Sequence, residues 1–257
     1  MRDATMMLRQ VSYENRAFWR NPPAAFFTFV FPLIFLVLFN VLFGNNTIEV
    51  EGGATNEATF YVPAIAALSV ISACYTNVAM TIAINRDDGV LKRIHGSPLP
   101  VAIFVLGRVV HATLVALLLV AIVTAFGAIF YDVDPPTTAL PAFTVTVLVG
   151  AAAFSALGIA LASVIPNADA APAIVNVTIL PLFFISDVFI RLDDPPAWLD
   201  AVSYVFPVRH FSEALQTAFN PFVAGAGFEP MNLLVMALWG LGGFLFSLRF
   251  FTWEPGI

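Results

Sequence analysis

Residues 85–100 read NRDDGVLKRIHGSPLP, and the rest of the chain is organised around this stretch. It contains Lys92, the only lysine in a chain that is 11% charged. Long apolar runs flank it on both sides, at 60–84 and 101–131. Because a bilayer core of about 30 Å needs about 20 apolar residues per helix, each run is long enough to cross a membrane. The stretch is therefore predicted to be a polar loop that joins two membrane spans at one bilayer face.

The composition of the whole chain also indicates an integral membrane protein. Hydrophobic residues make up 60% of the 257 positions, well above the usual share in a soluble domain. Apolar stretches of span length predict an all-α polytopic membrane protein with six transmembrane helices, in a single domain over residues 1–257. The predicted spans are 23–44, 60–84, 101–131, 140–165, 173–190 and 231–250.

Residues 1–22 carry a basic amphipathic pattern ahead of the first span. Arg2, Arg9 and Arg16 recur every seven residues and Arg20 follows one turn later, while apolar side chains fill the opposite side. Such a helix tends to lie in the membrane interface, with its arginines toward anionic headgroups. An N-terminal interfacial amphipathic helix is predicted, and a solvated tail is the alternative.

Residues 191–222 are apolar in a helical pattern on each side of Pro207, but neither half is long enough to cross a bilayer. We expect two short re-entrant helices that dip into the outer leaflet or pack against the ends of the last two spans. Arg209 and Glu213 lie four residues apart and are expected to pair on the polar side.

Basic residues predict the orientation. Most Lys and Arg residues flank the spans on the side that holds the termini and the 85–100 loop, whereas the opposite side has only Arg191 and Arg209. By the positive-inside rule, both termini and the loop are predicted to be cytoplasmic.

Polar side chains within the spans have two possible explanations. A substrate path and ordinary helix packing both account for them, and Asp187 can also be a carboxylate that snorkels at a helix end. The possible path residues are Ser69, Ser72, Thr76, Asn77 and Asp187. Span 140–165 has a stripe of small residues that is predicted to let another helix approach closely, formed by Ala151, Ser155, Gly158 and Ala162.

Known catalytic motifs are missing from the sequence. It has neither a GxxxxGK[ST] phosphate loop nor HExxH, and its three histidines and one cysteine are too scattered to predict a metal centre. No catalytic, cofactor-binding or metal site is expected, and the chain is not expected to be an enzyme. The spans also lack the buried charges of a proton-driven pump, so energy for transport is expected from elsewhere.

Three features together resemble a known family. They are the basic N-terminal helix, the loop RDDGVLKRIHGSPLP at 86–100 followed by LGR at 106–108, and LPLFFISDVFI at 180–190 with PAWL at 196–199 and FPV at 206–208. With them the whole chain resembles a permease subunit of the type 2 ABC exporters, which include daunorubicin-resistance-like drug exporters and polysaccharide exporters. One departure is that family members often have Gly directly after the serine that matches Ser186 and Pro a few residues later. This chain has Asp187 and Arg191 there.

The resemblance implies that the 85–100 loop contains a cytoplasmic coupling helix that docks on a separate ATPase subunit, which binds ATP and Mg. The implied coupling residues are Arg86, Asp87, Asp88, Gly89, Val90, Leu91, Lys92, Arg93 and Ile94. Their charges suit a polar groove, and Val90, Leu91 and Ile94 offer an apolar anchor. A charged turn that only sets topology is the alternative. Residues 191–222 match the family's outer re-entrant helices.

The resemblance also implies an ATP-driven exporter of a drug, lipid or glycan-type substrate, working by alternating access. The expected location is the prokaryotic inner (plasma) membrane, and the expected partners are the ATPase, membrane lipids and a second permease copy or paralogue in a dimer, without nucleic acid. One alternative is an ATPase-independent channel or secondary carrier, which would transport without the ATPase. The other is a non-transporting membrane anchor, which would bind the ATPase without substrate-dependent ATP turnover.

Overall fold

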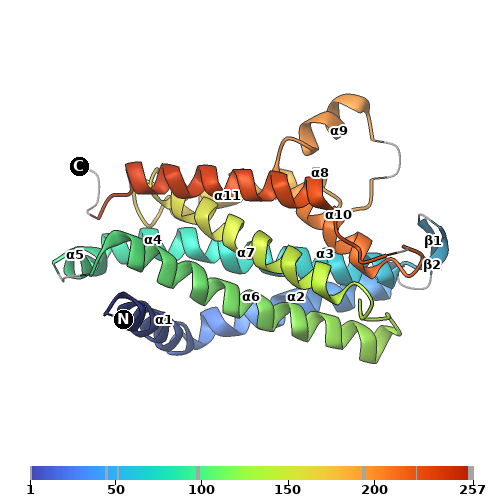
Figure 1. The fold of residues 1–257 in the computed structure, drawn as a ribbon, viewed down its shortest axis with the longest axis horizontal. Coiled ribbons are helices and arrows are strands. Elements are labelled where there is room, and N and C mark those ends of the chain that lie inside the picture. Colours follow the sequence, from blue (N-terminus) through green and yellow to red (C-terminus); the bar gives the residue numbers. More distant parts are fainter. Residues whose placement is uncertain are drawn as a thin grey trace.

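A computed structural model describes residues 2–43, 46–50, 52–96, 99–192, 195–223 and 225–253 of the protein. Over these ranges the chain forms a bundle of helices that run along one long axis, with a small β-hairpin at one end and both termini at the other (Figure 1). Helices α1 (Arg2–Trp19) and α5 (Val90–His95) lie at the end that holds the termini. We call this end of the bundle the α5 end, and the opposite one the hairpin end.

Five of the described helical segments are long and apolar enough to cross a membrane. They are α2 (Pro22–Phe43), the continuous segment Ala58–Asp87, α6 (Val101–Tyr131), α7 (Leu140–Ala162) and α11 (Pro230–Phe250). The segment Ala58–Asp87 consists of α3 (Ala58–Ile71), a π-helical turn η1 (Ser72–Thr76) and α4 (Asn77–Asp87). Their bounds agree with the predicted spans to within three residues, and those of α6 coincide with the predicted 101–131.

The predicted span 173–190 differs most from the structure. Its helix, α8 (Ala171–Ile185), has 15 residues and a length of roughly 22 Å, which is short of the bilayer core. The chain still passes from one end of the bundle to the other here. The backbone N–H of Ala168 donates to Asp87 at the α5 end, and the Arg191 guanidinium donates to the carbonyl of Glu49 at the hairpin end. A sixth crossing stays a prediction.

Two short helices follow α8, as predicted. They are α9 (Ala197–Ser203) and α10 (Pro207–Phe219). The apolar side of α10, with Phe211 and Leu215 fully buried, packs against α3, α7 and α11. The predicted i,i+4 pair is confirmed, with Arg209 Nε 2.7 Å from Glu213 Oε1. Entry of these helices into the outer leaflet is untested.

The hairpin is the one described element that departs from the predicted all-α fold. Strand β1 (Thr47–Val50) pairs antiparallel with β2 (Gly53–Asn56), with Thr47 opposite Asn56. Four-residue strands are too short to give a clear period-two pattern, which explains why the sequence did not predict them.

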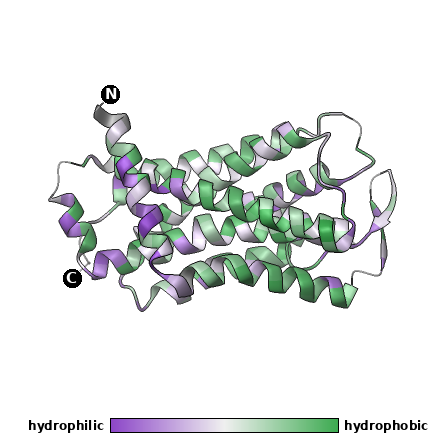
Figure 2. Cartoon of the chain, turned by 90° about the horizontal axis from the view of Figure 1, so that it is seen from below, coloured by the Kyte–Doolittle hydropathy of each residue, from purple (hydrophilic) through white to green (hydrophobic). Residues whose placement is uncertain are grey.

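Hydrophobicity is distributed as a bilayer requires. Figure 2 shows hydrophobic residues along the length of the bundle, with hydrophilic residues gathered toward the α5 end. Helix α3 is apolar on all sides and is buried by α2, α6, α7 and α10. Helix α2, by contrast, leaves most of its large apolar side chains exposed.

Parts of four predicted segments lie outside the described residues. These are Met1 of the 1–22 helix, Gly44 of the first span, Ser97 and Pro98 of the 85–100 loop, and Asp193 and Asp194 of the 191–222 segment.

Candidate functional site

The predicted coupling segment contains a helix. Helix α5 follows α4 after a turn at Gly89, whose φ of 70° lies in the left-handed region that favours glycine. Asp87, Asp88, Lys92 and Arg93 are exposed around this turn and helix. The charged face therefore points out of the protein at the α5 end of the bundle.

The apolar residues of the same segment point inward. Leu91 is 0% exposed and lies in the main hydrophobic core, and Ile94 packs against that core. The sequence predicts both residues as part of an apolar anchor for a partner, whereas in the structure they pack α5 against its own bundle. Sequence could not separate these two roles because both need the same apolar spacing on a short helix.

Arg86 also lies inside the protein, with 2% of its surface exposed. Its Nη1 donates to the carbonyl oxygen of Ala162 at 3.0 Å, and its Nη2 donates to the carbonyl of Ile165. A third contact, at 3.4 Å, reaches Thr252 Oγ1. The last carbonyls of a helix have no partner within it, so Arg86 caps the C-terminal end of α7.

Two more contacts fix α5 and the turn before it. Asp87 Oδ2 accepts a hydrogen bond of 2.5 Å from the backbone N–H of Ala168, in the turn between α7 and α8. The His95 ring stacks on Trp253 with centroids 5.0 Å apart. These contacts tie α5 and the turn before it to the α7–α8 turn and to the C-terminal segment.

The π-helical turn falls on the polar residues that were predicted to line a path. Ser69 is fully buried and donates to the carbonyl of Ile65 at 2.6 Å, which is a packing role. Ser72, Thr76 and Asn77 are half-buried on a side of the span that this chain leaves partly open. Single π-turns inside α-helices occur often at functional sites. No pattern in the sequence indicated this one.

The predicted small-residue stripe lies on α7. Ala151, Ser155, Gly158 and Ala162 are all buried. A Cβ atom at Gly158 would lie 2.7 Å from the carbonyl oxygen of Tyr75 and 3.0 Å from that of Cys74. The absence of a side chain at Gly158 is therefore what lets the backbone of η1 pack directly on α7.

A cavity of about 280 Å³, lined by apolar side chains and a few polar and charged ones, opens between α1, α4 and α6 near the α5 end. Glu14 and Arg108 form an ion pair at its wall, with Nη1 and Oε1 3.4 Å apart and side chains 9% and 6% exposed. Asn77 of the predicted path also lines this cavity. Glu14 was not singled out from the sequence, because nothing local links it to a residue so far along the chain.

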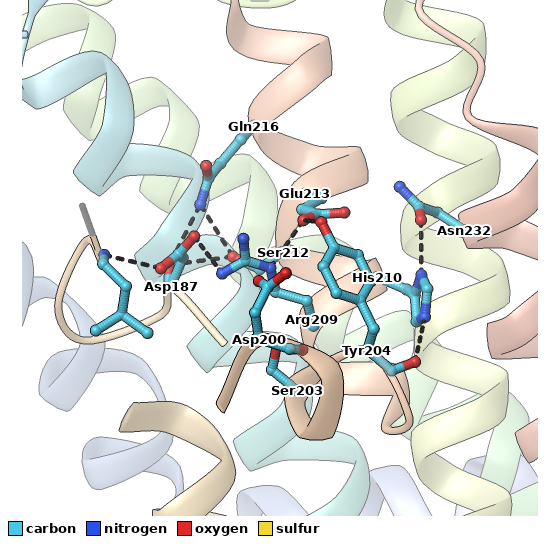
Figure 3. A network of polar contacts seen from close by, with 11 residues as sticks. Asp187, Asp200, Ser203, Tyr204, Arg209, His210, Ser212, Glu213, Gln216 and Asn232 are labelled. Carbon is cyan, nitrogen blue, oxygen red and sulfur yellow. Dashed lines mark hydrogen bonds and ion pairs between the residues drawn. The ribbon is translucent and has the colours of Figure 1, made fainter. Parts of the chain in front are cut away.

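Asp187 belongs to a polar cluster at the hairpin end. Figure 3 shows its carboxylate facing Arg209, with Glu213 and Tyr204 on the other side of the guanidinium. The second carboxylate oxygen accepts the backbone N–H of Leu192 at 3.0 Å. Ser212 Oγ and Gln216 Nε2 both donate to the Asp187 carbonyl at 3.2 Å. These contacts tie the end of α8 to α10.

The backbone conformation at Asp187 explains why this chain can have Asp where family members often have Gly. Its φ is 52°, in the left-handed region that glycine adopts most readily and Asp tolerates. Glycine after the serine would suit the same turn. Here the carboxylate adds the pair with Arg209, so contacts within the chain account for Asp187.

Burial and charge perturb three groups of this cluster. Burial raises the pKa of Asp187, with Arg209 opposing this effect. Burial lowers the pKa of Arg209, but the Asp187 and Glu213 carboxylates outweigh it and the net pKa is raised. Burial, together with Glu213, raises the pKa of Tyr204. The cluster therefore holds one cation between two carboxylates.

Across the described part of the chain, no group of three or more His, Cys, Asp and Glu side chains is arranged to hold a metal ion. The candidate functional features are the charged face of α5, the π-turn, the cavity with Glu14 and Arg108, and the polar cluster around Asp187.

Comparison with known proteins identifies relatives. The family model for the ABC-2 type transporter matches residues 8–220. A protein of Escherichia coli (strain K12), described as probable multidrug ABC transporter permease YbhR, is 25% identical over 154 residues, which are 60% of this chain and 42% of that protein. A putative transport permease, ycf38, of Cyanophora paradoxa is 24% identical over 229 residues, which are 88% of this chain and 72% of that protein. The match thus spans less than half of the E. coli relative.

Proposed function

The chain belongs to the ABC-2 type transporter family, and on that premise we propose that it is the membrane-spanning permease subunit of an ATP-driven exporter. Its family and its apolar helices make it a multi-pass membrane protein. In the proposal, a separate ATPase subunit binds ATP and Mg and hydrolyses the nucleotide. This chain performs no catalytic step. It lies in the inner membrane of a prokaryote, with the α5 end in the cytoplasm.

The division of α5 into two faces is the observation that carries the proposal. The exposed face presents Lys92 and Arg93, with Asp88 exposed in the turn before it, while Leu91 joins the core behind it. Arg86 and Asp87 connect the same turn to α7 and to the α7–α8 turn. A helix that is charged outside and firmly attached inside suits a coupling element, because a push from a partner would move whole spans as rigid bodies.

The substrate path is proposed to follow the half-buried side of η1 and α4, past Ser72, Thr76 and Asn77. A second permease copy or a paralogue would close this side, and the exposed apolar face of α2 adds a surface for it or for lipid. The helices α9 and α10 would form the outer gate as re-entrant elements. Drugs, lipids and glycan-type molecules are the candidate substrates.

Charge reversal on α5 tests the coupling role. The double variant Lys92→Glu and Arg93→Glu is expected to lose the ATPase subunit that co-purifies with the wild-type chain, while membrane insertion stays intact. The matched control is Arg16→Glu with Arg20→Glu, which changes the same charge on exposed residues of α1 and the residue after it. Leu91 and Ile94 are unsuitable positions, because changes there would disrupt the core.

The alternatives predict other results. Substrate transport by proteoliposomes that contain this chain alone would indicate a channel or secondary carrier. ATPase binding without substrate-stimulated ATP turnover would indicate an anchor. If the α5 double variant retained its ATPase as well as the control did, the proposed docking face would be wrong.

A further inference from the structure

The cavity between α1, α4 and α6 contains charges that the coupling role does not use. Glu14 of α1 and Arg108 of α6 form an ion pair in its lining, and both are more than nine-tenths buried. Burying two charges is costly unless their remaining hydrogen-bonding capacity is used. A ligand in the cavity would be able to use this capacity.

Arg108 has more donors than its contacts employ. A guanidinium carries five N–H donors, and within the described part of the chain Arg108 makes one hydrogen bond, of 3.4 Å, to Glu14. His111 lies one turn along α6 and lines the same cavity. Its Nε2 is buried and has no hydrogen-bond partner among the described residues. Together these two side chains present hydrogen-bonding capacity that suits an anionic oxygen.

Glu14, in contrast, has acceptor positions that call for a hydrogen-bond donor. Its carboxylate accepts from Gln10 Nε2 at 2.9 Å and from Arg108, and an ionised carboxylate has about four acceptor positions. A ligand with only a negative charge would meet attraction from Arg108 and repulsion from Glu14 at nearly the same place. A ligand that carries an anion and an N–H-bearing cation a few bonds apart would satisfy both.

The size and position of the cavity narrow the ligand further. Its volume of about 280 Å³ is near the lower limit of small-molecule sites, which suits a head group better than a whole drug. Tyr13 and Ile84, two of its lining residues, are exposed, so the lining that holds the ion pair also offers exposed apolar surface. An amphiphile could therefore keep its head in the cavity and its chains outside.

From these observations we propose that the cavity binds the head group of an amphiphile with a phosphodiester and a primary ammonium, as in phosphatidylethanolamine. The phosphate contacts Arg108 and His111, and the ammonium donates to Glu14. A quaternary ammonium lacks the N–H that Glu14 requires, and a purely anionic head group lacks the cation. The site thus discriminates among head groups by charge pattern rather than by net charge.

Lipid retention tests the proposal without any variant. The purified full chain is exchanged into nanodiscs of phosphatidylethanolamine, phosphatidylcholine or phosphatidylglycerol with identical acyl chains, extracted in detergent, and analysed for bound lipid by native mass spectrometry. Retention of phosphatidylethanolamine is expected to exceed that of the other two by about tenfold, the scale of one charge-assisted hydrogen bond. Equal retention of all three lipids, or preference for either of the other two, would overturn the proposal.

A variant in which both charged side chains are replaced by neutral ones tests whether the ion pair causes the preference. Glu14→Gln with Arg108→Gln removes both charges together, and its retention of phosphatidylethanolamine is expected to fall to that of the other lipids. Arg16→Gln, an exposed arginine on the same helix, is the control and should keep the preference. Full retention by the double variant would place the lipid elsewhere.

The amount of lipid bound to the complex before and after ATP turnover separates a resident lipid from transported cargo. A resident lipid stays bound, whereas cargo is released. Only this step rests on the proposed function, because head-group preference is measured on the chain without its ATPase. The two proposals can therefore fail independently.

Discussion

The Arg86 guanidinium donates a hydrogen bond of 3.0 Å to the carbonyl oxygen of Ala162, the last residue of α7. Through this bond the charged end of one span caps the end of another. The contact joins the segment before α5 to the helix on which the π-turn packs. The charged helix α5 and the π-turn η1, on which the proposed function depends, are thus linked through α7.

Replacing Arg86 with Met is expected to lower the free energy of unfolding by about 2–4 kcal/mol, because hydrogen bonds from a charged donor are lost and buried carbonyls are left without partners. Arg93→Met, at an exposed position of α5, is the control and should cost less than about 0.5 kcal/mol. Cys74 is the single cysteine and is buried, so the rate of its labelling by a thiol-reactive dye during heating reports unfolding. If Cys74 became labelled at the same midpoint temperature in both variants, the capping role of Arg86 would be contradicted.

Gly158→Ala is expected to destabilise the bundle by about 1–3 kcal/mol, since the added methyl would overlap backbone oxygen atoms of η1 that have little room to move. Gly242→Ala on α11 is the matched control. Its Cβ would meet nothing within 4 Å, and alanine favours a helix over glycine, so it should be neutral or stabilising. Thermal unfolding followed by circular dichroism compares them. A Gly158→Ala midpoint at or above that of Gly242→Ala would rule out close packing.

The stability of the polar cluster at the hairpin end should depend unequally on Arg209 and Asp187. Arg209→Met leaves the carboxylates of Asp187 and Glu213 together without a cation, and is expected to cost about 3–5 kcal/mol. Asp187→Asn keeps an acceptor for the Leu192 N–H and leaves Arg209 paired with Glu213, so it should cost about 1 kcal/mol. Thermal midpoints of both variants test this order, and the reverse order would show that the cation is dispensable.

The pH dependence of stability should change with Asp187. Because burial raises its pKa, the folded protein holds this proton more tightly than the unfolded chain does. Stability from this group is therefore lost as the pH rises from the ordinary value of about 3.9 through the raised pKa. The midpoint of Asp187→Asn minus that of wild type should grow across this window and level off above it. A difference that shrinks with rising pH would contradict the shift.

Substrate contact at the π-turn predicts a separation of two activities. Ser72→Leu with Thr76→Leu should lower substrate-stimulated ATP turnover about tenfold, the scale of one lost polar contact, while the ATPase still co-purifies. Thr144→Leu, at an exposed threonine on α7, is the control. Unchanged stimulation in the double variant would leave these residues with a packing role only.

Much of the fold was predictable because membrane spans are a local signal. An apolar run of about 20 residues is enough by itself to favour a membrane span, whatever the rest of the chain does. The predicted bounds of α6 therefore coincide with the observed ones, and those of the other long spans nearly do. The pair Arg209 and Glu213 was predictable because helix geometry alone brings residues four apart together. The C-terminal end of α8 was predicted too late, because apolar residues continue past Ile185 although the backbone turns at Asp187.

The sequence by itself determined that this is a multi-span helical membrane protein with a short charged helix at one end and a close-packed stripe on α7. Only the tertiary structure decided which residues far apart in the sequence meet. Arg86 and Ala162 are 76 positions apart, and Glu14 and Arg108 are 94 apart. No local term links such residues, because their contact depends on how whole helices pack. That packing sets which side chains are left to bind a partner or a lipid.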